Sequence, residues 1–372
     1  MKPLAGNPLA NLLAAFCTAA LCAACGGGGG GGAVGAGAPT VSARVPTLSL
    51  VAGVPMDANT IYVGGFADGD GAAARFNNPA AIAADTDGNL YVADRSNCAI
   101  RKISAAGHVS TLAGSPQHCS TLDGGPDVAG FAFLTALTVS PDGTLYATDG
   151  LAVREITQAG QVRTIATLDT ATVMNSSLTP YDDMYFFGSG IAVDGFANVV
   201  VANTVGIRKI APAGAVTILD GVARLDSNAG VLGSQSFNKR GLAAARDGTV
   251  YVGELDSTVS RIDTAGKKMT LAGLSGAPGY ADGVAGAARF GQVVALTLDA
   301  AGNLYAADAG NNLVRKITPD RTVSTVAGTR GATSVQLGNA PGALPALAGL
   351  TSDGKGNLYA ISGNAVVKIT LP

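Results

Sequence analysis

Short apolar runs alternate with turn residues along most of the chain. In the plainest stretch, which begins at Phe76 and ends at Gly114, the runs AAIAAD, DGNLYVAD, AIRKIS and GHVSTLAG follow one another. These runs contain many β-branched and aromatic residues, and turn-forming sequences such as DGN and AG separate them. The pattern therefore predicts four short strands that are joined by hairpins into one antiparallel sheet.

This four-strand unit occurs six times. One aligned position recurs at intervals of 51 to 55 residues and is occupied by Tyr91, Tyr146, Val200, Tyr251, Tyr305 and Tyr359. A single four-stranded sheet would expose two apolar faces to water, so the units must pack against one another around an axis. We therefore predict an all-β fold, a six-bladed β-propeller with four-stranded antiparallel blades, over residues 45–372.

The two ends of the repeat array complement each other. The sixth unit stops after its third strand, at residues 368–370, whereas residues 46–53 carry a strand-four pattern that belongs to no other unit. We expect this N-terminal strand to complete the last blade, because the pairing closes the ring and removes two free sheet edges.

Two segments that precede a first strand are nearly identical. They read ADGDGAAARF at residues 67–76 and ADGVAGAARF at residues 281–290, and each leads to a strand, a GNLY turn, an aspartate and the sequence RKI. The units resemble the NHL repeats of six-bladed bacterial propellers, and the resemblance covers residues 45–372. It implies the fold rather than an activity, because NHL propellers range from binding scaffolds and sensor domains to lyases.

The N-terminal segment has the character of an export signal. An apolar stretch over residues 9–21 follows Lys2 and is too short to span about 30 Å of hydrocarbon as a helix. It ends in the sequence LCAAC, which resembles the bacterial lipobox, although Cys22 stands where that pattern has a larger aliphatic residue. The resemblance implies a lipoprotein-type signal peptide over residues 1–24 and lipidation of Cys25.

A glycine-rich tether follows over residues 25–44. Its seven consecutive glycines cannot hold a fixed conformation. Gly26 stands where an aspartate would resemble an inner-membrane retention signal, so we expect a lipid anchor in the bacterial cell envelope, at the outer membrane, on its periplasmic or its surface face. An ordinary cleaved signal peptide is the alternative, and both interpretations export the protein.

Export also changes how the cysteines are interpreted. Cys17 and Cys22 leave with the signal peptide, and Cys25 carries the lipid. Cys98 and Cys119 are then the pair in the folded part, and an even pair in an exported chain predicts a disulfide. Both lie in connections that share one face of the predicted ring. Two unpaired thiols are the alternative.

The low charge limits the classes of partner. Charged residues make up 13% of the chain and the formal net charge is −2, against roughly 25% charged residues in a typical soluble domain. No basic surface is available to neutralise phosphates, so we exclude nucleic acid as a partner. The 47% of apolar residues excludes a disordered chain.

Polar residues recur at the end of the second strand of each unit, and a basic residue follows several positions later in the chain. A residue that recurs once per blade usually holds that blade together, so we expect polar bonds across the hairpin between strands two and three. A ring of calcium ligands is the alternative. The recurring polar residues are Asp94, Asp149, Asn203, Glu254, Asp308 and Ser362.

The first strand of each unit is expected to line the axis, and its residues are small and apolar. Six-bladed lactonases resemble this architecture but need a Glu, Asn and Asp metal cage in the channel, which these strands do not supply. The chain has two histidines, too few for the three imidazole ligands that the zinc site of peptidyl-amidating lyases needs. We therefore predict no catalytic residue, no metal and no cofactor.

The connection over residues 172–190 carries the most distinctive side chains. Four of the chain's 19 aromatic residues lie there within seven positions, next to two acids. The candidate binding residues are Tyr181, Asp182, Asp183, Tyr185 and Phe186. We predict an exposed anchor for a protein or glycan partner, and the alternative is that these side chains fold back onto the blades.

A second candidate is the cation pair Lys239 and Arg240. We expect these side chains at the mouth of the channel beside Asn77, Asn78 and Gln292, where they suit an anionic ligand.

Two function classes follow from these features. The leading hypothesis is a noncatalytic, lipid-anchored propeller, monomeric, that binds a protein or polysaccharide partner in the cell envelope through its loop-bearing face. The alternative is a metal-dependent hydrolase or lyase of the lactonase-like six-bladed type, with the metal at the channel mouth.

Overall fold

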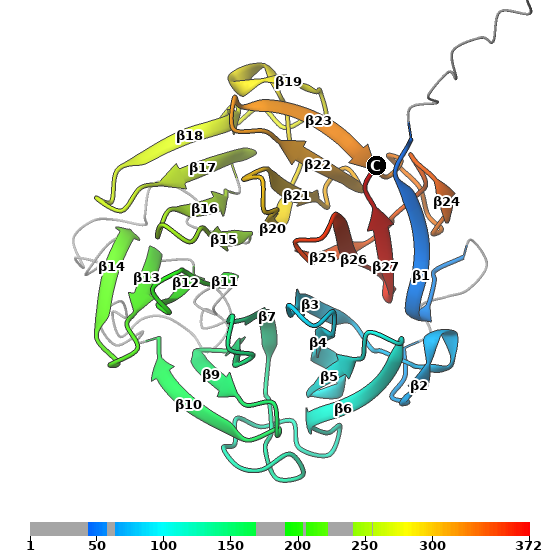
Figure 1. The fold of residues 1–372 in the computed structure, drawn as a ribbon, viewed down its shortest axis with the longest axis vertical. Coiled ribbons are helices and arrows are strands. Elements are labelled where there is room, and N and C mark those ends of the chain that lie inside the picture. The colour runs from blue at the N-terminus through cyan, green and yellow to red at the C-terminus, as the bar shows by residue number, and fades with distance from the viewer. Residues whose placement is uncertain (1–43, 58–63, 169–189, 204–205, 222–240, 255) are drawn as a thin grey trace, which may run out of the picture. The chain divides into compact units, whose positions relative to one another are not determined.

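Six antiparallel sheets surround a central axis in the computed structural model (Figure 1). The structure describes residues 44–57, 64–168, 190–203, 206–221, 241–254 and 256–372. Each sheet is one blade, and the strands of each repeat follow one another from the axis outward, as the pattern predicts. The six-bladed, all-β fold is therefore confirmed.

The strands divide among the blades as follows. Blade 1 consists of β2 (Gly69–Asp70), β3 (Pro79–Ala84), β4 (Leu90–Asp94), β5 (Ala99–Ile103) and β6 (His108–Gly114), and blade 2 of β7 (Leu134–Val139), β8 (Leu145–Asp149), β9 (Ala152–Ile156) and β10 (Val162–Thr167). Blade 3 consists of β11 (Gly190–Val193), β12 (Val199–Asn203), β13 (Gly206–Ile210) and β14 (Val216–Gly221), and blade 4 of β15 (Leu242–Ala244), β16 (Val250–Gly253), β17 (Thr258–Ile262) and β18 (Lys268–Gly273). Blade 5 consists of β19 (Gly283–Val284), β20 (Val293–Leu298), β21 (Leu304–Asp308), β22 (Leu313–Ile317) and β23 (Thr322–Ala327), and blade 6 of β1 (Thr47–Val54), β24 (Gly338–Asn339), β25 (Leu347–Ser352), β26 (Asn357–Ser362) and β27 (Asn364–Thr370). The described residues also form the single-turn 3₁₀ helices η1 (Gly71–Ala73), η2 (Arg95–Asn97) and η4 (Ala285–Ala287).

The N-terminal strand closes the ring, as the sequence predicts. β1 pairs antiparallel with β27, from Thr47 opposite Thr370 to Val54 opposite Asn364, with one bulge. The two strands lie side by side in Figure 1, one blue and one red. Leu48 and Ala52 of β1 are buried, so this strand contributes to the core as well as to the ladder.

Within the described ranges, blades 1, 5 and 6 have a fifth strand that the repeat pattern does not predict. The connection that enters blade 1 folds back so that β2 pairs with the outer strand β6, with Gly69 opposite Val109. In the same way, β19 pairs with the outer strand β23 of blade 5, and β24 pairs with the outer strand β1 of blade 6. These two-residue strands exist because the outer strand offers unpaired backbone groups, and their own sequence has no strand pattern.

Small residues let neighbouring inner strands approach each other. A Cβ atom on Gly241 would lie 3.1 Å from the carbonyl carbon of Ala295 in the next blade, and one on Gly349 would lie 3.3 Å from Cα of Ala81. Contacts this close leave no room for larger side chains. The alanines and glycines of the first strands therefore allow the six blades to converge on a narrow axis.

A tyrosine on the second strand anchors the turn that precedes it. The Tyr91 hydroxyl donates to Asp85 Oδ2 at 3.0 Å and lies 2.7 Å from Oε1 of Gln158 in blade 2. Burial, and next the hydrogen bond to Asp85, raise the pKa of Tyr91 to about 12. Tyr91 thus connects the hairpin turn of blade 1 to blade 2, and Tyr305 and Tyr359 bind the corresponding turn of their own blades.

Candidate binding site at the channel mouth

The six inner strands enclose a cavity of about 660 Å³ along the axis. Most of the residues that line it are alanine, valine, leucine or isoleucine, as predicted, while polar atoms contribute more of the exposed wall surface than apolar atoms do. The first strand of each blade contributes one branched aliphatic residue to the same level of the wall. In every blade this residue pairs with the strand-two residue that directly follows the recurring tyrosine position. This ring consists of Ile82, Leu137, Ile191, Leu242, Leu296 and Leu350.

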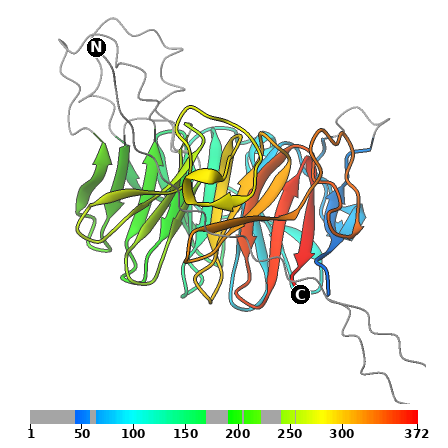
Figure 2. The ribbon, with the colours of Figure 1, turned by 90° about the horizontal axis from the view of Figure 1, so that it is seen from above.

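Polar and aromatic residues surround the loop-bearing end of this channel. Asn78, Phe133 and Gln292 line the cavity, and each lies two residues after a buried phenylalanine of its blade. Arg95, from η2, lines the same end. The described connections between blades and those between second and third strands emerge at one of the two ends that Figure 2 shows. The mouth therefore draws its side chains from several blades.

Arg95 and Phe133 form a stacked pair across the boundary between blades 1 and 2. The guanidinium carbon of Arg95 lies 5.1 Å from the centre of the Phe133 ring, a cation–π distance. Arg95 Nε donates to the carbonyl of Leu134 at 2.7 Å, and the Phe133 N–H donates to Asp149 Oδ1 at 2.6 Å. Both partners of the stack are thus fixed by hydrogen bonds to β7 or β8.

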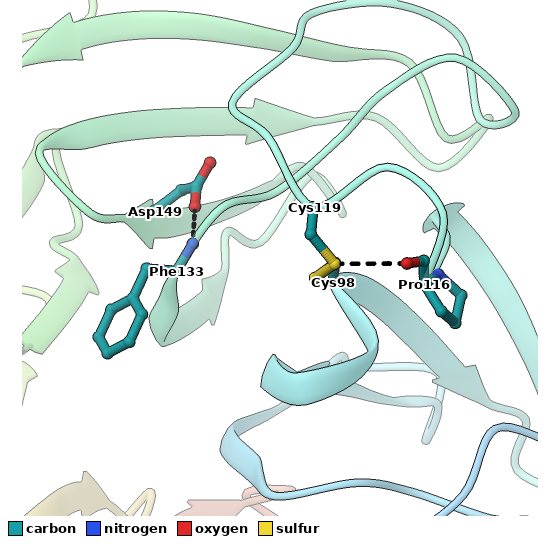
Figure 3. Close-up of a disulfide and its surroundings, with 5 residues drawn as sticks. All are labelled: Cys98, Pro116, Cys119, Phe133 and Asp149. Carbon is teal, nitrogen blue, oxygen red and sulfur yellow. Dashed lines mark hydrogen bonds between the residues drawn. A yellow bond between two sulfur atoms is a disulfide. The ribbon is translucent and has the colours of Figure 1, made fainter.

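A disulfide joins the two loops that carry this stack. Cys98 follows η2, Cys119 lies in the connection between β6 and β7, and their Cα atoms are 5.2 Å apart. The predicted pairing is therefore confirmed. Figure 3 shows the Phe133 ring pointing away from the disulfide, while Cys119 Sγ lies 3.5 Å from the carbonyl of Pro116. Cross-linking these loops restricts their motion relative to each other.

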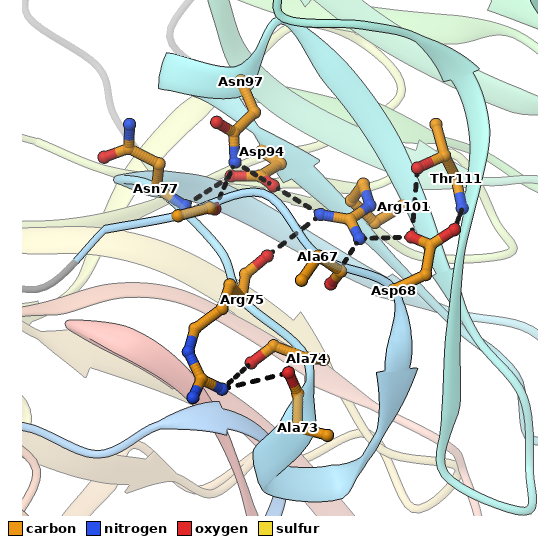
Figure 4. A network of polar contacts seen from close by, with 11 residues as sticks. Ala67, Asp68, Ala73, Ala74, Arg75, Asn77, Asp94, Asn97, Arg101 and Thr111 are labelled. Atoms are coloured by element: carbon orange, nitrogen blue, oxygen red, sulfur yellow. Dashed lines mark hydrogen bonds and ion pairs between the residues drawn. The ribbon is translucent and has the colours of Figure 1, made fainter.

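The recurring acid of strand two pairs with a buried arginine of strand three. In blade 1, Arg101 Nη1 lies 3.0 Å from Asp94 Oδ2, and Nη2 lies 2.5 Å from Asp68 Oδ1 (Figure 4). Both Arg101 and Asp94 are fully buried. Asp94 also accepts the Asn77 N–H at 2.8 Å and a hydrogen bond from Asn97. The geometry is that of a bond across the hairpin, as predicted.

Burial raises the pKa of Asp94, while the hydrogen bonds from Asn97 and Asn77 and the Arg101 charge oppose that rise. The same cluster recurs around Arg154 in blade 2 and Arg315 in blade 5. Three such clusters fix the backbone just before the first strand of their blades, because the arginine also binds carbonyl groups there.

The other three blades use different bonds at the same position. Asn203 Oδ1 accepts from Arg208 at 3.2 Å, Glu254 pairs with Lys268 of β18 at 2.6 Å, and the Ser362 hydroxyl donates to the carbonyl of Pro345. Asn203 and Ser362 lie at the ends of second strands and Glu254 follows directly after one, so all three positions are one strand away from the channel wall. Among the described residues, no group of three or more His, Cys, Asp and Glu side chains is placed to share a metal ion.

Several predicted site residues lie outside the described part of the chain: Cys25, Tyr181, Asp182, Asp183, Tyr185, Phe186, Lys239 and Arg240. The segments 169–189 and 222–240 lead into β11 and β15, whose first residues Gly190 and Leu242 line the channel.

Of the neighbours predicted at the mouth, Asn78 and Gln292 line it. Asn77 does not line it, and its side chain lies against Gly64. Sequence reasoning missed Arg95 and Phe133. The position two residues after the repeated phenylalanine is the signal that could have identified Phe133.

A family model described as the NHL repeat matches residues 76–103, which span β3 to β5. No curated protein matches the chain in sequence. No helix in the described ranges has the length and apolar character to cross a membrane.

Solved structures of bacterial propellers share the fold. A structural genomics protein of unknown function from Bacteroides thetaiotaomicron is 20% identical with a TM-score of 0.68, over 88% of this chain and 76% of that one. An auxiliary nutrient binding protein from the same species is 14% identical with a TM-score of 0.64, over 87% and 76%. A gluconolactonase from Xanthomonas campestris is 12% identical with a TM-score of 0.53, over 86% and 98%. At these identities the likeness establishes the fold.

Proposed function

We propose that this propeller is a noncatalytic, lipid-anchored protein of the bacterial cell envelope that binds a protein or polysaccharide partner through its loop-bearing face. The observation that carries the proposal is the pre-organised mouth of the channel. Its described wall includes the amide side chains of Asn78 and Gln292 and the Arg95–Phe133 stack. Such groups orient a ligand by hydrogen bonds and apolar contact.

The stack is held in place before any ligand arrives. The Cys98–Cys119 disulfide joins its two loops, and Asp149 binds the Phe133 backbone. A site that is already ordered loses little conformational entropy on binding, which favours affinity. The auxiliary nutrient binding protein among the structural neighbours is consistent with a binding role for this architecture.

The envelope location is supported by two independent features. The LCAAC sequence that ends at Cys25 resembles a lipobox, and disulfides such as Cys98–Cys119 persist in oxidising compartments. In this proposal, residues 1–24 are the signal peptide and residues 25–44 are the tether of a monomeric propeller. Radiolabelled palmitate should enter the wild-type protein in cells and should not enter Cys25→Ser.

The residues that we propose as additional partner contacts are Tyr181, Asp182, Asp183, Tyr185, Phe186, Lys239 and Arg240. Their segments adjoin β11 and β15, whose inner ends line the channel. Deleting residues 179–185 should leave the circular dichroism spectrum unchanged and weaken partner capture. Undiminished capture of every partner would argue against this surface.

Photo-crosslinking in the native envelope tests whether the loop-bearing face contacts the partner. A benzoylphenylalanine placed at Gln292, in the channel wall, should capture a protein or glycan partner. The control is the same group at Asp87, an exposed residue in the turn between β3 and β4 at the opposite end of the strands. Equal capture from the two positions, or none from either, would contradict a binding face at the mouth.

The alternative is a metal-dependent hydrolase or lyase of the lactonase-like type, and the shared architecture with a gluconolactonase supports it. Metal analysis of gently purified protein discriminates between the two functions. A stoichiometric divalent ion, bound with lactone-hydrolysing activity that a chelator abolishes, would favour the enzyme.

A further inference from the structure

A second pocket lies between blades 4 and 5, at the end of the strands that carries the turns after the first and third strands. It has a volume of about 200 Å³, and apolar atoms contribute more of its exposed wall than polar atoms do. Blade 4 contributes three residues that are paired across its sheet: Tyr251 of β16, Arg261 of β17 and Met269 of β18. None of the described residues that line this pocket belongs to the channel mouth, so its ligand is independent of the proposed function.

Blade 1 shows what fills the equivalent space at its boundary with blade 2. There the Tyr91 hydroxyl binds Asp85 in its own turn and Gln158 in the next blade, and Gln158 also donates to a carbonyl group of blade 2. In blade 4, Ala245 stands at the position of Asp85, and in blade 5, Pro319 stands at the position of Gln158. Apolar residues have thus replaced both partners of the tyrosine hydroxyl, and Pro319 has no amide with which to bridge the two blades.

Two side chains with hydrogen-bond donors, Tyr251 and Arg261, line this pocket. Among the described residues, neither the hydroxyl nor the guanidinium forms a hydrogen bond or an ion pair, and Arg261 Nε is buried. The arginines of the three buried clusters also leave Nε without a partner, but their Nη atoms bind carboxylates. Arg261 helps to lower the pKa of Asp247, after the hydrogen bonds from Thr249, yet the two form no ion pair. An acceptor group in the pocket would therefore meet donors that the described fold does not use.

A second cation at this pocket has an unusual backbone conformation. Arg321 lies in the left-handed region with a φ of 70°, which costs free energy for a residue with a Cβ atom. Its side chain donates from Nε to the carbonyl of Leu271 in β18 at 2.9 Å, which holds the positive charge beside the pocket wall. The first four blades have glycine at this turn position: Gly107, Gly160, Gly214 and Gly266.

We propose that the pocket between blades 4 and 5 binds a small organic carboxylate, in which one carboxylate group is attached to an apolar ring of about the size of benzene. A guanidinium donates two parallel N–H groups to a carboxylate, so Arg261 holds this group and the Tyr251 hydroxyl donates to it. Burial raises the pKa of Tyr251, opposed in part by the Arg261 charge, so the hydroxyl keeps its proton at neutral pH. Thr318 is not assigned to the ligand, because its hydroxyl donates to Asp320 in the same turn.

The size and the walls of the pocket select the rest of the ligand. The ring lies against the aliphatic side chains of Leu271, Leu304 and Ile317. A cavity of about 150 Å³ with aliphatic and aromatic walls holds benzene, so about 200 Å³ has room for the ring and its carboxylate. A doubly charged phosphate would lose more hydration energy against such walls than a carboxylate does.

Calorimetric titration of the full chain with three probes at pH 7 tests the charge and the ring. Benzoate should bind with a dissociation constant below about 10 mM. It should bind at least about tenfold more tightly than benzyl alcohol, which lacks the charge, and than acetate, which lacks the ring. Equal affinity for benzoate and either of the other probes, or no saturable binding of benzoate below about 10 mM, would overturn the assignment.

Replacing the arginine tests where the carboxylate binds. Arg261→Gln should weaken benzoate binding about tenfold and leave the weak affinity for benzyl alcohol unchanged. Lys102→Gln is the matched control, because Lys102 has the equivalent position in blade 1, where it lies over the Tyr91 ring at 5.6 Å. Circular dichroism must show that both variants are folded. Benzoate binding that survives Arg261→Gln unchanged, or that Lys102→Gln weakens equally, would refute the site.

A second variant closes the pocket and leaves the arginine in place. Pro319→Gln restores the residue that blade 2 has at this turn position, so the variant should fold and its amide should bridge to Tyr251, as Gln158 does to Tyr91. It should weaken benzoate binding at least about tenfold, because the amide occupies the space of the ligand. Undiminished binding of benzoate by the folded variant would show that benzoate binds elsewhere and would overturn the proposal.

Discussion

Replacing Arg154 with methionine tests how much the buried arginine clusters contribute to stability. Arg154 is fully buried, and its Nη1 lies 2.8 Å from Asp149 and 3.2 Å from the carbonyl of Gly130. Its Nη2 lies 2.8 Å from both Asp123 and the carbonyl of Leu122. Methionine keeps most of the aliphatic volume and removes all four polar contacts.

The expected loss in the free energy of unfolding depends on the buried groups that lose Arg154 as their partner. Asp149 is also fully buried and retains the Phe133 N–H and the Thr121 hydroxyl, but its charge is no longer compensated. Breaking a buried pair on one side costs about 3–5 kcal/mol, and two carbonyl groups also lose a donor. We therefore expect a loss of about 5 kcal/mol in the free energy of unfolding.

Urea denaturation provides the measurement. The chain has no tryptophan, so unfolding is followed by far-ultraviolet circular dichroism. With a slope of about 3 kcal/mol per molar urea, a loss of about 5 kcal/mol lowers the midpoint by roughly 1.5 M. Arg163→Met is the control in the same blade. Arg163 is exposed and pairs with Glu155, so its loss should cost less than about 1 kcal/mol.

A decrease of less than about 0.5 M for Arg154→Met, or a decrease equal to that of Arg163→Met, would refute the reasoning. Either result would mean that the Asp149 carboxylate is stabilised without Arg154. The Arg154 cluster would then not be what fixes the start of β7.

Three further predictions concern the disulfide, the tyrosine turns and the ring closure. Replacing Cys98 and Cys119 with serine opens a 21-residue loop and should cost about 3 kcal/mol; calorimetry should show a lower midpoint that no longer responds to reductant. Because the pKa of Tyr91 is raised from 10.0 to about 12, the folded state holds the phenolic proton more tightly. Its contribution to stability is therefore complete below pH 10 and is lost as the pH rises toward 12. The thermal midpoint of Tyr91→Phe should fall less over that range than that of the wild type. Removing the chain through Val54 exposes the β27 edge and should give aggregates on size-exclusion chromatography, whereas a truncation that keeps β1 should stay monomeric.

Repetition made the architecture predictable from the sequence. Six aligned strand patterns establish the number of blades, and the unpaired strand-four pattern at residues 46–53 predicts the partner of β27. The disulfide was predictable for a related reason, since strand order places Cys98 and Cys119 on one face. These features depend on local patterns and on the order of elements.

Features that depend on contacts between distant segments were not predictable. β2 is a strand because Gly69 and Asp70 meet β6, and nothing in the residues themselves indicates extended structure. Arg95 reaches the mouth because its Nε binds the carbonyl of Leu134, 39 residues further along the chain. Such positions follow from how neighbouring blades pack, which the pattern within one repeat does not contain.

In blade 2, the Asp149 carboxylate both pairs with the buried arginine and positions a residue of the proposed binding site. Asp149 uses Oδ2 to pair with Arg154 and Oδ1 to accept the Phe133 N–H. Asp94 and Asp308 bind the backbone at Asn77 and Gln292 in blades 1 and 5. The repeated cluster therefore fixes the backbone beside each mouth position, while the side chain there differs between blades as Asn78, Phe133 or Gln292. If the propeller binds a ligand at the mouth, as we propose, the differences between these side chains determine which ligand fits, and the repeated clusters maintain the backbone that carries them.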